Sequence, residues 1–527
     1  MTEPLPAARR SLVVVVPGLR CDLEPWKDLR RALEERDLLP ERPDWLFLDH
    51  GVRRHTRKPL IVAAREIAGR IADQWRLAGG YDAITLVGHS AGALLLRRAW
   101  LNEIDETLRI NPTPAPWAEK VVRFVLFAGI SRGVCTESLS WPVRLLTRLM
   151  EVVPGKFTME ETFRGAGFIT DLRIDWVRYF ASAATDRPRP RTVQLLGSSD
   201  ALVGREDSID LTSFPNSELW DVPGGTHSNL HRFAQSDNPE ARLRQIADAL
   251  QFDRPQDPPP ATEEPKSVLM IVHGIRASRI DDWVETAQRR VEERWPGQVV
   301  VQRPTYGYLS AVRFALPMVR KRYARYFRDF YTETISRHKG APISVLCHSN
   351  GTYALGRCLL EFEAIRVERV ALAGSVLPSD FKWSELVSRK RVKDLRSDGG
   401  SADWPVGILC RLLRSLGMKD VGTGGFDGFR DIANDVRYHP GGHGAMLAQP
   451  NLDSILGFLV EGQLPAAKAL PRTSRMLPIS RAVPYLAWLL LAALAAAVAL
   501  ALVQGQFLLV GGIVLALLLV AIVLDIV

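Results

Sequence analysis

The sequence predicts an α/β protein with two tandem units, each a mostly parallel sheet flanked by helices, followed by two transmembrane helices. Three observations support this prediction. A chain of 527 residues is too long for one compact core. Short β-branched runs alternate with longer amphipathic stretches in both halves, as in parallel sheets with crossover helices. Finally, the segment 482–527 is almost free of charge, although the whole chain has an ordinary mean hydropathy of −0.02.

The two halves show strand candidates in a similar order, which indicates a diverged internal duplication. The first half, 1–250, offers Leu12–Val16, Trp45–Leu48, Ala83–Val87, Val121–Phe127, Thr192–Leu196 and the short Leu219–Val222. The second half, 267–465, offers Val268–Val272, Gln298–Val301, Ile343–Leu346, Val370–Ala373 and Arg391–Leu395. Between them, 251–266 contains five prolines and reads as a semi-rigid exposed linker.

The apolar tail predicts a helical hairpin in a membrane. Ala482–Val503 and Phe507–Val527 are each about 21 residues long, roughly 31 Å as a helix, and a short polar turn separates them. The alternative is a buried helical pair in a soluble core. The preceding segment 466–481 is basic, so the positive-inside bias places the soluble units on the cytoplasmic side. The arginine-rich composition favours a bacterial protein, and hence the inner membrane.

Charge and cysteine usage limit the functional classes. The net charge of +9 allows an anionic partner, and for a membrane-attached chain lipid headgroups are favoured over nucleic acid. Five scattered cysteines without a C-x-x-C pair argue for reduced thiols and against a zinc site. The pairs His227/His231 and His439/His443 flank glycine-rich loops rather than lying on a helix, so no metal is predicted.

One motif of the first half predicts nucleophilic catalysis. Gly88-His89-Ser90-Ala91-Gly92 joins a strand candidate to a helical stretch, the setting in which a strained turn exposes a serine hydroxyl. Asp200 follows a later strand, and His227 follows the last one on a Gly-Gly-Thr-His loop. The order serine, acid, histidine at successive strand ends predicts a triad of Ser90, Asp200 and His227.

These motifs resemble the α/β-hydrolase superfamily, in its serine esterase or lipase-like branch. The resemblance covers residues 11–250 and rests on V-V-V-V-P-G-L, G-H-S-A-G, G-S-S-D-A-L-V and G-G-T-H. It implies that Ser90 attacks, His227 shuttles the proton and Asp200 orients the imidazole. It also implies an oxyanion hole built from the backbone N–H groups of Ala91 and Leu19.

The second half repeats this layout with substitutions, so the resemblance implies a second, diverged α/β-hydrolase domain. Cys347-His348-Ser349-Asn350-Gly351 has cysteine where the first elbow has glycine, and Cys347 is expected to be buried rather than nucleophilic. The expected triad is Ser349, Asp403 and His443. Asp403 is preferred over Asp398 and Asp380 because its spacing to Val406 and Gly407 repeats that of Asp200 to Val203 and Gly204. Its oxyanion donors are expected at Ile275 and Asn350. The alternative is a degenerate copy kept for packing or partner contact.

Two further segments bear on the substrate. An apolar insertion at about 130–191 is expected to form a cap over the pocket, unless its helices pack as ordinary core. The basic and aromatic segment 309–338 suits either an amphipathic face on anionic headgroups or a solvated helix with aromatics in the core.

The sequence therefore predicts a membrane-anchored serine hydrolase without a cofactor. It is expected to cleave carboxylic esters, lipid esters or thioesters through an acyl-enzyme, with a small-molecule or lipid ester as substrate and no nucleic acid partner. Two alternatives stay open: a catalytically silent membrane scaffold with hydrolase folds, and an acyltransferase that uses the same triad. The sequence indicates no oligomeric state.

Overall fold

The computed structural model divides the chain into two compact units. One comprises Met1–Glu263 with Tyr331–Gly340, and the other Glu264–Phe330 with Ala341–Val527. The structure describes residues 10–19, 22–39, 42–53, 56–135, 158–181, 187–200, 217–251, 267–274, 282–303, 314–431, 436–462 and 476–505.

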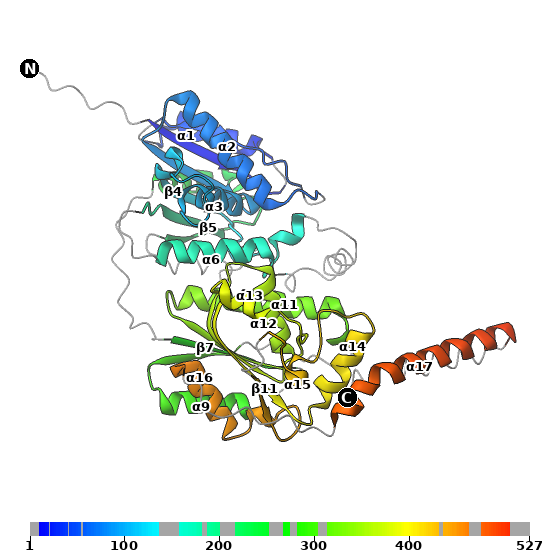
Figure 1. Ribbon diagram of the computed structural model, residues 1–527. Helices are drawn as coiled ribbons and strands as arrows, with labels where there is room; N and C mark the ends of the chain where they lie inside the picture. The colour runs from blue at the N-terminus through cyan, green and yellow to red at the C-terminus, as the bar shows by residue number, and fades with distance from the viewer. Residues whose placement is uncertain are drawn as a thin grey trace, which may run out of the picture. The chain divides into compact units, whose positions relative to one another are not determined.

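The first unit is a six-stranded sheet covered by helices on both faces (Figure 1). Its strands are β1 (Ser11–Val16), β2 (Asp44–Phe47), β3 (Ala83–His89), β4 (Val121–Phe127), β5 (Arg191–Gly197) and β6 (Ser217–Val222). Its helices are α1 (Glu24–Glu35), α2 (Leu60–Ala78), α3 (Ala91–Ile104), α4 (Pro116–Glu119), η1 (Thr158–Thr162), α6 (Gly167–Ala181), η3 (Phe233–Gln235) and α8 (Pro239–Gln251).

Every strand pair of this sheet is parallel, and the strand order is β2-β1-β3-β4-β5-β6. Alternate side chains of β1 enter two separate cores, as the two-residue period of a strand requires. Val14 joins the core formed with α2, α3 and α6, whereas Val15 joins the core formed with α1 and α8. The unit is therefore a three-layer sandwich whose central strands are buried on both faces.

The second unit has the same architecture. Its strands are β7 (Ser267–Val272), β8 (Val299–Gln302), β9 (Ile343–His348), β10 (Val367–Ala373), β11 (Val392–Gly400) and β12 (Val436–His439). Its helices are α9 (Asp282–Arg294), α11 (Pro317–Arg337, whose residues from Tyr331 on are grouped with the first unit), α12 (Asn350–Glu361), α13 (Trp383–Ser388), the π-helix η4 (Pro405–Cys410), α14 (Arg411–Ser415), α15 (Gly424–Asp427), η6 (Ala445–Leu447), α16 (Asn451–Glu461) and α17 (Met476–Val503).

The two sheets have one topology. The second sheet runs β12-β11-β10-β9-β7-β8, which is the order of the first sheet counted from the other edge, and all its pairs are parallel. In each sheet the chain reverses its direction of growth after the second strand, β2 or β8, so the reversal lies between β1 and β3 or between β7 and β9. In open parallel sheets the carboxyl ends of the strands at such a reversal form a crevice where ligands bind.

The insertion expected to form a cap is only partly described. α6 lies in the core of the first unit, where Trp176 contacts Trp100 and Phe124 through edge-on and tilted ring contacts. α6 thus packs as a core crossover helix between β4 and β5, so this helix of the insertion is ordinary core and not part of a cap. Residues 136–157 and 182–186, on which the rest of the cap prediction falls, lie outside the described residues.

α11 uses two of its arginines inside the second unit. Arg320 is fully buried, and its Nη2 donates to both carboxylate oxygens of Asp420 at 2.9 and 3.0 Å. Arg328 is also buried and lies 3.6 Å from Glu361. These two side chains cannot belong to a lipid-facing surface, so the amphipathic interpretation of this segment is wrong for them.

α17 is the one helix, among the described residues, that is long and apolar enough to cross a membrane. Its most apolar 18-residue window has a mean hydropathy of 2.7 and is only 6% buried. The second predicted span, Phe507–Val527, lies outside the described residues.

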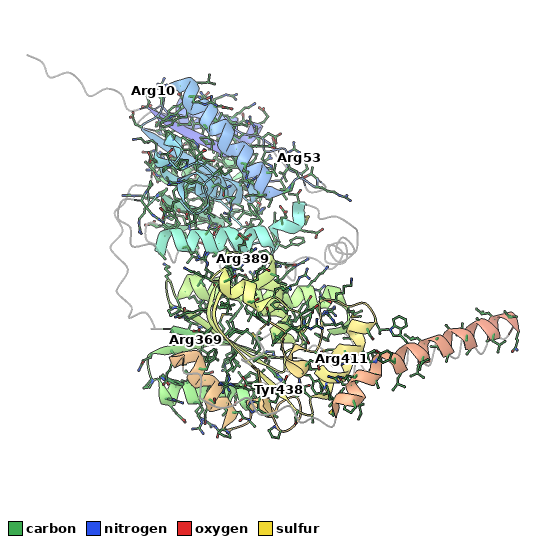
Figure 2. The ribbon with its side chains drawn as sticks, viewed as in Figure 1. Arg10, Arg53, Arg369, Arg389, Arg411 and Tyr438 are labelled. Atoms are coloured by element: carbon green, nitrogen blue, oxygen red, sulfur yellow. The ribbon has the colours of Figure 1, made fainter. Side chains whose placement is uncertain are left out.

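The first turns of α17 contact the folded part of the second unit near η4 and α14. Ser480 is fully buried; its Oγ donates to the carbonyl of Gly407 and accepts from Arg411 Nε at 2.8 Å. Figure 2 labels Arg411 at this junction. The hydrogen bonds of Ser480 therefore attach the start of α17 to the second unit, ahead of its apolar part.

Candidate active site

A strained turn after β3 presents Ser90. Its backbone has φ +52° and ψ −119°, outside the regions that L-residues prefer, and α3 begins at the next residue. Gly92 permits this turn because a Cβ there would lie 2.2 Å from the carbonyl oxygen of Val16. Gly88 is equally constrained, since its Cβ would lie 2.6 Å from the Cα of Ala93. The two glycines of the motif are thus required by close approach of the backbone.

Three loops bring Ser90, His227 and Asp200 together. His227 Nε2 lies 3.0 Å from Ser90 Oγ, and His227 Nδ1 lies 3.1 Å from Asp200 Oδ2. The Asp200 side chain is fully buried, while the His227 side chain is 19% exposed. A buried carboxylate beside Nδ1 selects the tautomer in which Nε2 is free to accept a proton from the hydroxyl.

The expected oxyanion donors of the first unit lie beside Ser90. Ala91 is buried and is the first residue of α3, so its N–H has no acceptor within the helix. Leu19 follows β1 and is partly buried against the core that contains Val14. The loop after β1, which carries Leu19, passes very close to Ser90, because a Cβ on Gly18 would lie 3.2 Å from the Cβ of Ser90.

The second unit repeats the turn. Ser349 has φ +54° and ψ −122°, and α12 begins at the next residue, Asn350. A Cβ on Gly351 would lie 2.5 Å from the carbonyl oxygen of Val272. Cys347 occupies the position of the missing glycine; it is fully buried, and burial raises the pKa of its thiol well above the usual value. Such a thiol is inert, in agreement with its expected structural role.

The second unit joins only two of its three candidate residues by a hydrogen bond. His443 Nδ1 lies 2.8 Å from Asp403 Oδ2, and the Asp403 side chain is fully buried. Both His443 and Ser349 are described, but the structure gives no hydrogen bond between them. Ser349 is also only 4% exposed. Ile275 lies outside the described residues, so its role as an oxyanion donor stays a prediction.

The other candidate acids of the second unit have different partners. Asp398 pairs with Arg396 at 2.8 and 3.0 Å and with His439 Nε2 at 2.8 Å. These hydrogen bonds and the arginine charge hold the pKa of Asp398 below its usual value despite the opposing effect of burial. Asp380 pairs with Arg414 at 2.9 Å.

Strand register relates the two acids. Phe127 pairs with Leu195 in the first sheet, as Ala373 pairs with Asp398 in the second. Five residues further along the chain, these registers reach Asp200 and Asp403. The two carboxylates therefore occupy equivalent positions after β5 and β11.

The histidine pairs with i, i+4 spacing do not converge on a common point. His231 stacks on Trp26 with ring centroids 4.3 Å apart, and His439 binds Asp398. Across the residues that the structure describes, no group of three or more His, Cys, Asp or Glu side chains is arranged to hold a metal.

Sequence reasoning missed one residue in each site. His89 Nε2 lies 2.7 Å from the carbonyl oxygen of His227, and His348 Nε2 lies 3.1 Å from the carbonyl oxygen of His443. The signal was available, because both elbows have His directly before the serine. The orientation of the His89 ring, however, depends on the loop of His227, which lies more than a hundred residues further along the chain.

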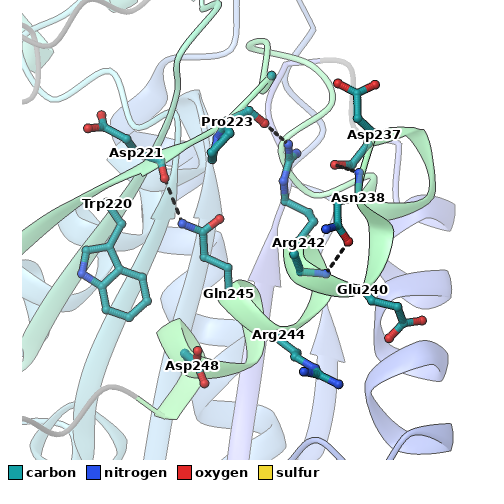
Figure 3. A pocket seen from close by; sticks show the side chains of 13 residues that line it. Trp220, Asp221, Pro223, Asp237, Asn238, Glu240, Arg242, Arg244, Gln245 and Asp248 are labelled. Atoms are coloured by element: carbon teal, nitrogen blue, oxygen red, sulfur yellow. Dashed lines mark hydrogen bonds between the residues drawn. The ribbon is translucent and has the colours of Figure 1, made fainter.

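A cavity of about 950 Å³ opens beside β6 and α8 (Figure 3). Its walls carry both charges, including Asp221, Glu240 and Arg244. Arg242 closes one side by donating to the carbonyl of Pro223 at 2.6 Å. The lining does not include Ser90, Asp200 or His227, so the cavity is separate from the candidate catalytic residues.

Comparisons with known proteins give only distant likenesses. Neither a protein-family model nor a curated protein matches this sequence. Among solved structures, an esterase from Pyrobaculum calidifontis is 16% identical with a TM-score of 0.32, covering 46% of this chain and 76% of its own. A Bacillus licheniformis lipase is 14% identical with a TM-score of 0.29, covering 43% of this chain and 88% of its own. A Thermogutta terrifontis esterase phosphonylated by sarin is 18% identical with a TM-score of 0.31, covering 47% and 84%.

Proposed function

We propose that the chain is a membrane-anchored serine hydrolase of the α/β-hydrolase type, which cleaves carboxylic esters through an acyl-enzyme on Ser90. One observation carries the proposal: His227 lies within hydrogen-bond distance of both Ser90 Oγ and the buried carboxylate of Asp200. A serine at a strained strand-to-helix turn, a base and an orienting acid on three strand ends form the arrangement that activates a hydroxyl nucleophile.

The proposed reaction has two halves. Ser90 Oγ attacks the ester carbonyl carbon while its proton passes to His227 Nε2, and the backbone N–H groups of Ala91 and Leu19 stabilise the oxyanion. His227 then protonates the departing alcohol, which leaves an acyl-Ser90. In the second half His227 removes a proton from water, the hydroxide attacks the acyl carbon, and Ser90 regains its proton as the acid departs.

The anchor favours a lipid-derived ester as substrate. α17 has the length and hydropathy of a membrane span, and the basic residues before it favour the cytoplasmic side of a bacterial inner membrane for both units. An enzyme confined to that surface meets esters and thioesters with long acyl chains at high local concentration. Acyl transfer to an alcohol instead of water would use the same residues.

A scaffold role is the second candidate, and it applies to the second unit. The burial of Ser349 supports a silent copy there, and so does the lack of a hydrogen bond between Ser349 and His443. We therefore assign the chemistry to the first unit.

A fluorophosphonate probe tests the proposal, because it phosphonylates only an activated serine. Purified full-length protein should label in the wild type and in Ser349→Ala, and Ser90→Ala should lose nearly all label. An unlabelled wild type would refute the enzymatic function. Label retained in Ser90→Ala but lost in Ser349→Ala would move the chemistry to the second unit.

A further inference from the structure

The histidine before each candidate nucleophile makes the same contact in both units. His89 Nε2 lies 2.7 Å from the main-chain oxygen of His227, and His348 Nε2 lies 3.1 Å from that of His443. A carbonyl oxygen can only accept, so Nε2 must carry the hydrogen in each case. Two sequences that differ at the first glycine and at the fourth residue of the motif thus keep one hydrogen bond to the loop of the candidate base.

The opposite edge of each ring faces the loop that follows the first strand of its sheet. A Cβ on Gly18 would lie 3.0 Å from His89 Nδ1, and a Cβ on Gly274 would lie 3.3 Å from His348 Nδ1. Each imidazole therefore fills the space between the expected oxyanion loop and the loop that carries the candidate base. A side chain in that place controls the separation of the two loops.

The surroundings keep the ring uncharged. Burial and the nearby His227 ring together lower the pKa of His89 to about 4, against the opposing effects of its hydrogen bond to the His227 carbonyl and the charge of Asp200. Burial likewise lowers the pKa of His348 to about 3. The ring centroids of His89 and His227 are 5.3 Å apart, so a charged His89 would oppose protonation of His227.

We propose that His89 is a positioning residue, whose neutral imidazole holds the main chain of His227 so that the His227 ring stays between Ser90 and Asp200. His89 does not touch substrate and exchanges no proton during the reaction. The expected effect on the reaction rate rests on the proposed function, whereas the hydrogen bond between His89 and the His227 carbonyl is independent of it.

Three variants separate the hydrogen bond from the ring. His89→Phe keeps a planar ring without a donor, and His89→Gln keeps a side-chain N–H of similar reach. His231→Phe is the matched control, because His231 belongs to the same cluster, with its centroid 5.2 Å from that of His89, and its Nδ1 has no partner among the described residues. All are made in full-length Ser349→Ala protein in detergent micelles, so that Ser90 alone reacts.

Kinetics and amide exchange give independent readouts. We expect His89→Phe to lower kcat for a p-nitrophenyl ester, and the rate of phosphonylation, by about tenfold to a hundredfold with KM nearly unchanged, since misplaced catalytic groups cost rate rather than affinity. Amides of residues 224–231 should exchange roughly twofold to tenfold faster, as loss of one hydrogen bond predicts. His89→Gln should recover most of both losses, and His231→Phe should behave as the parent.

Equal defects in the Gln and Phe variants would overturn the inference in favour of a packing role, as would unchanged rates and exchange in His89→Phe. If His89→Phe does not fold, the amide exchange of residues 441–446 in His348→Phe and His348→Gln decides the same question in the second unit. If the wild type neither labels nor hydrolyses, the proposed function fails, while the exchange comparison still tests the hydrogen bond.

Discussion

At the scale of single residues, the glycines of the two elbows show why this part of the site is predictable. Gly92 and Gly351 each lie so close to a strand carbonyl that a Cβ would approach it to 2.2 and 2.5 Å. Only glycine satisfies that geometry, so the motif appears directly in the sequence. His89 and His348 carry no such steric requirement, because their role depends on where a distant loop ends.

The buried imidazole of His231 predicts acid sensitivity of the first unit. Burial, with the nearby His89 and Arg232, lowers the pKa of His231 to about 2, whereas the unfolded chain keeps the ordinary value of 6.5. Between these values the unfolded state binds a proton that the folded state does not. The free energy of unfolding therefore falls as the pH drops below 6.5, by at most about 1.4 kcal/mol per pH unit from this group.

His231→Phe removes this linkage while keeping a ring against Trp26. Between pH 7 and pH 5 the melting temperature of the wild type should fall several degrees more than that of the variant, as a contribution of up to about 2 kcal/mol implies. Thermal unfolding at the two pH values measures the difference. Parallel declines in the two proteins would show that His231 takes up its proton in the folded state.

At the scale of elements, the junction of α17 with η4 makes a specific prediction for Ser480. Its hydroxyl accepts from Arg411 Nε at 2.8 Å and donates to Gly407, whose N–H in turn donates to the carbonyl of Asp403 at 2.9 Å. Ser480→Ala leaves buried polar groups unpaired and should destabilise the second unit by about 1–3 kcal/mol.

Ile479→Ala is the control for Ser480→Ala, because Ile479 lies on the same helical turn with 57% of its surface exposed. It should change stability by less than about 0.5 kcal/mol. Thermal unfolding of both full-length variants in detergent provides the measurement. Equal melting temperatures for the two variants would mean that the Ser480 hydroxyl contributes no net stability to this junction.

Most strands were predictable, and the exception has a physical reason. Apolar β-branched runs located β1, β3 and β4 to within about two residues, and Val121–Phe127 has the predicted bounds. β12 was missed, because Val436–His439 is short and contains Arg437 and Tyr438. An edge strand with one neighbour needs no continuous apolar run, so its sequence carries little signal.

At the scale of the whole molecule, two sheets of the same topology carry candidate sites that differ in their side-chain contacts. Both sheets have the same strand order, and both place a serine at positive φ and an acid at the equivalent strand end. The difference lies in side chains: the second unit buries Ser349 and carries the Arg396–Asp398–His439 network in its sheet. Sequence motifs predicted the repeated layout. Whether His443 forms a hydrogen bond with Ser349 depends on their relative placement, which no motif encodes.

The apolar segment 482–527 is expected to attach the whole chain to the membrane. A protein ending at Arg481 keeps the docked turn with Ser480 but loses 482–527, so it should leave the membrane fraction and remain soluble after an alkaline wash. Full-length protein should stay with the membranes, since a span of this hydropathy partitions stably into a bilayer.

Point variants test the same attachment without removing chain. Leu491→Arg with Leu494→Arg places two charges near the middle of the span, at roughly 2.5–3.5 kcal/mol each on insertion scales, and should weaken membrane retention. If the protein ending at Arg481 stays membrane-bound, the attachment must come from another surface. The exposed Lys321 and Arg322 of α11 are then the first candidates, because anionic headgroups attract such basic side chains, and high salt should release a protein held in that way.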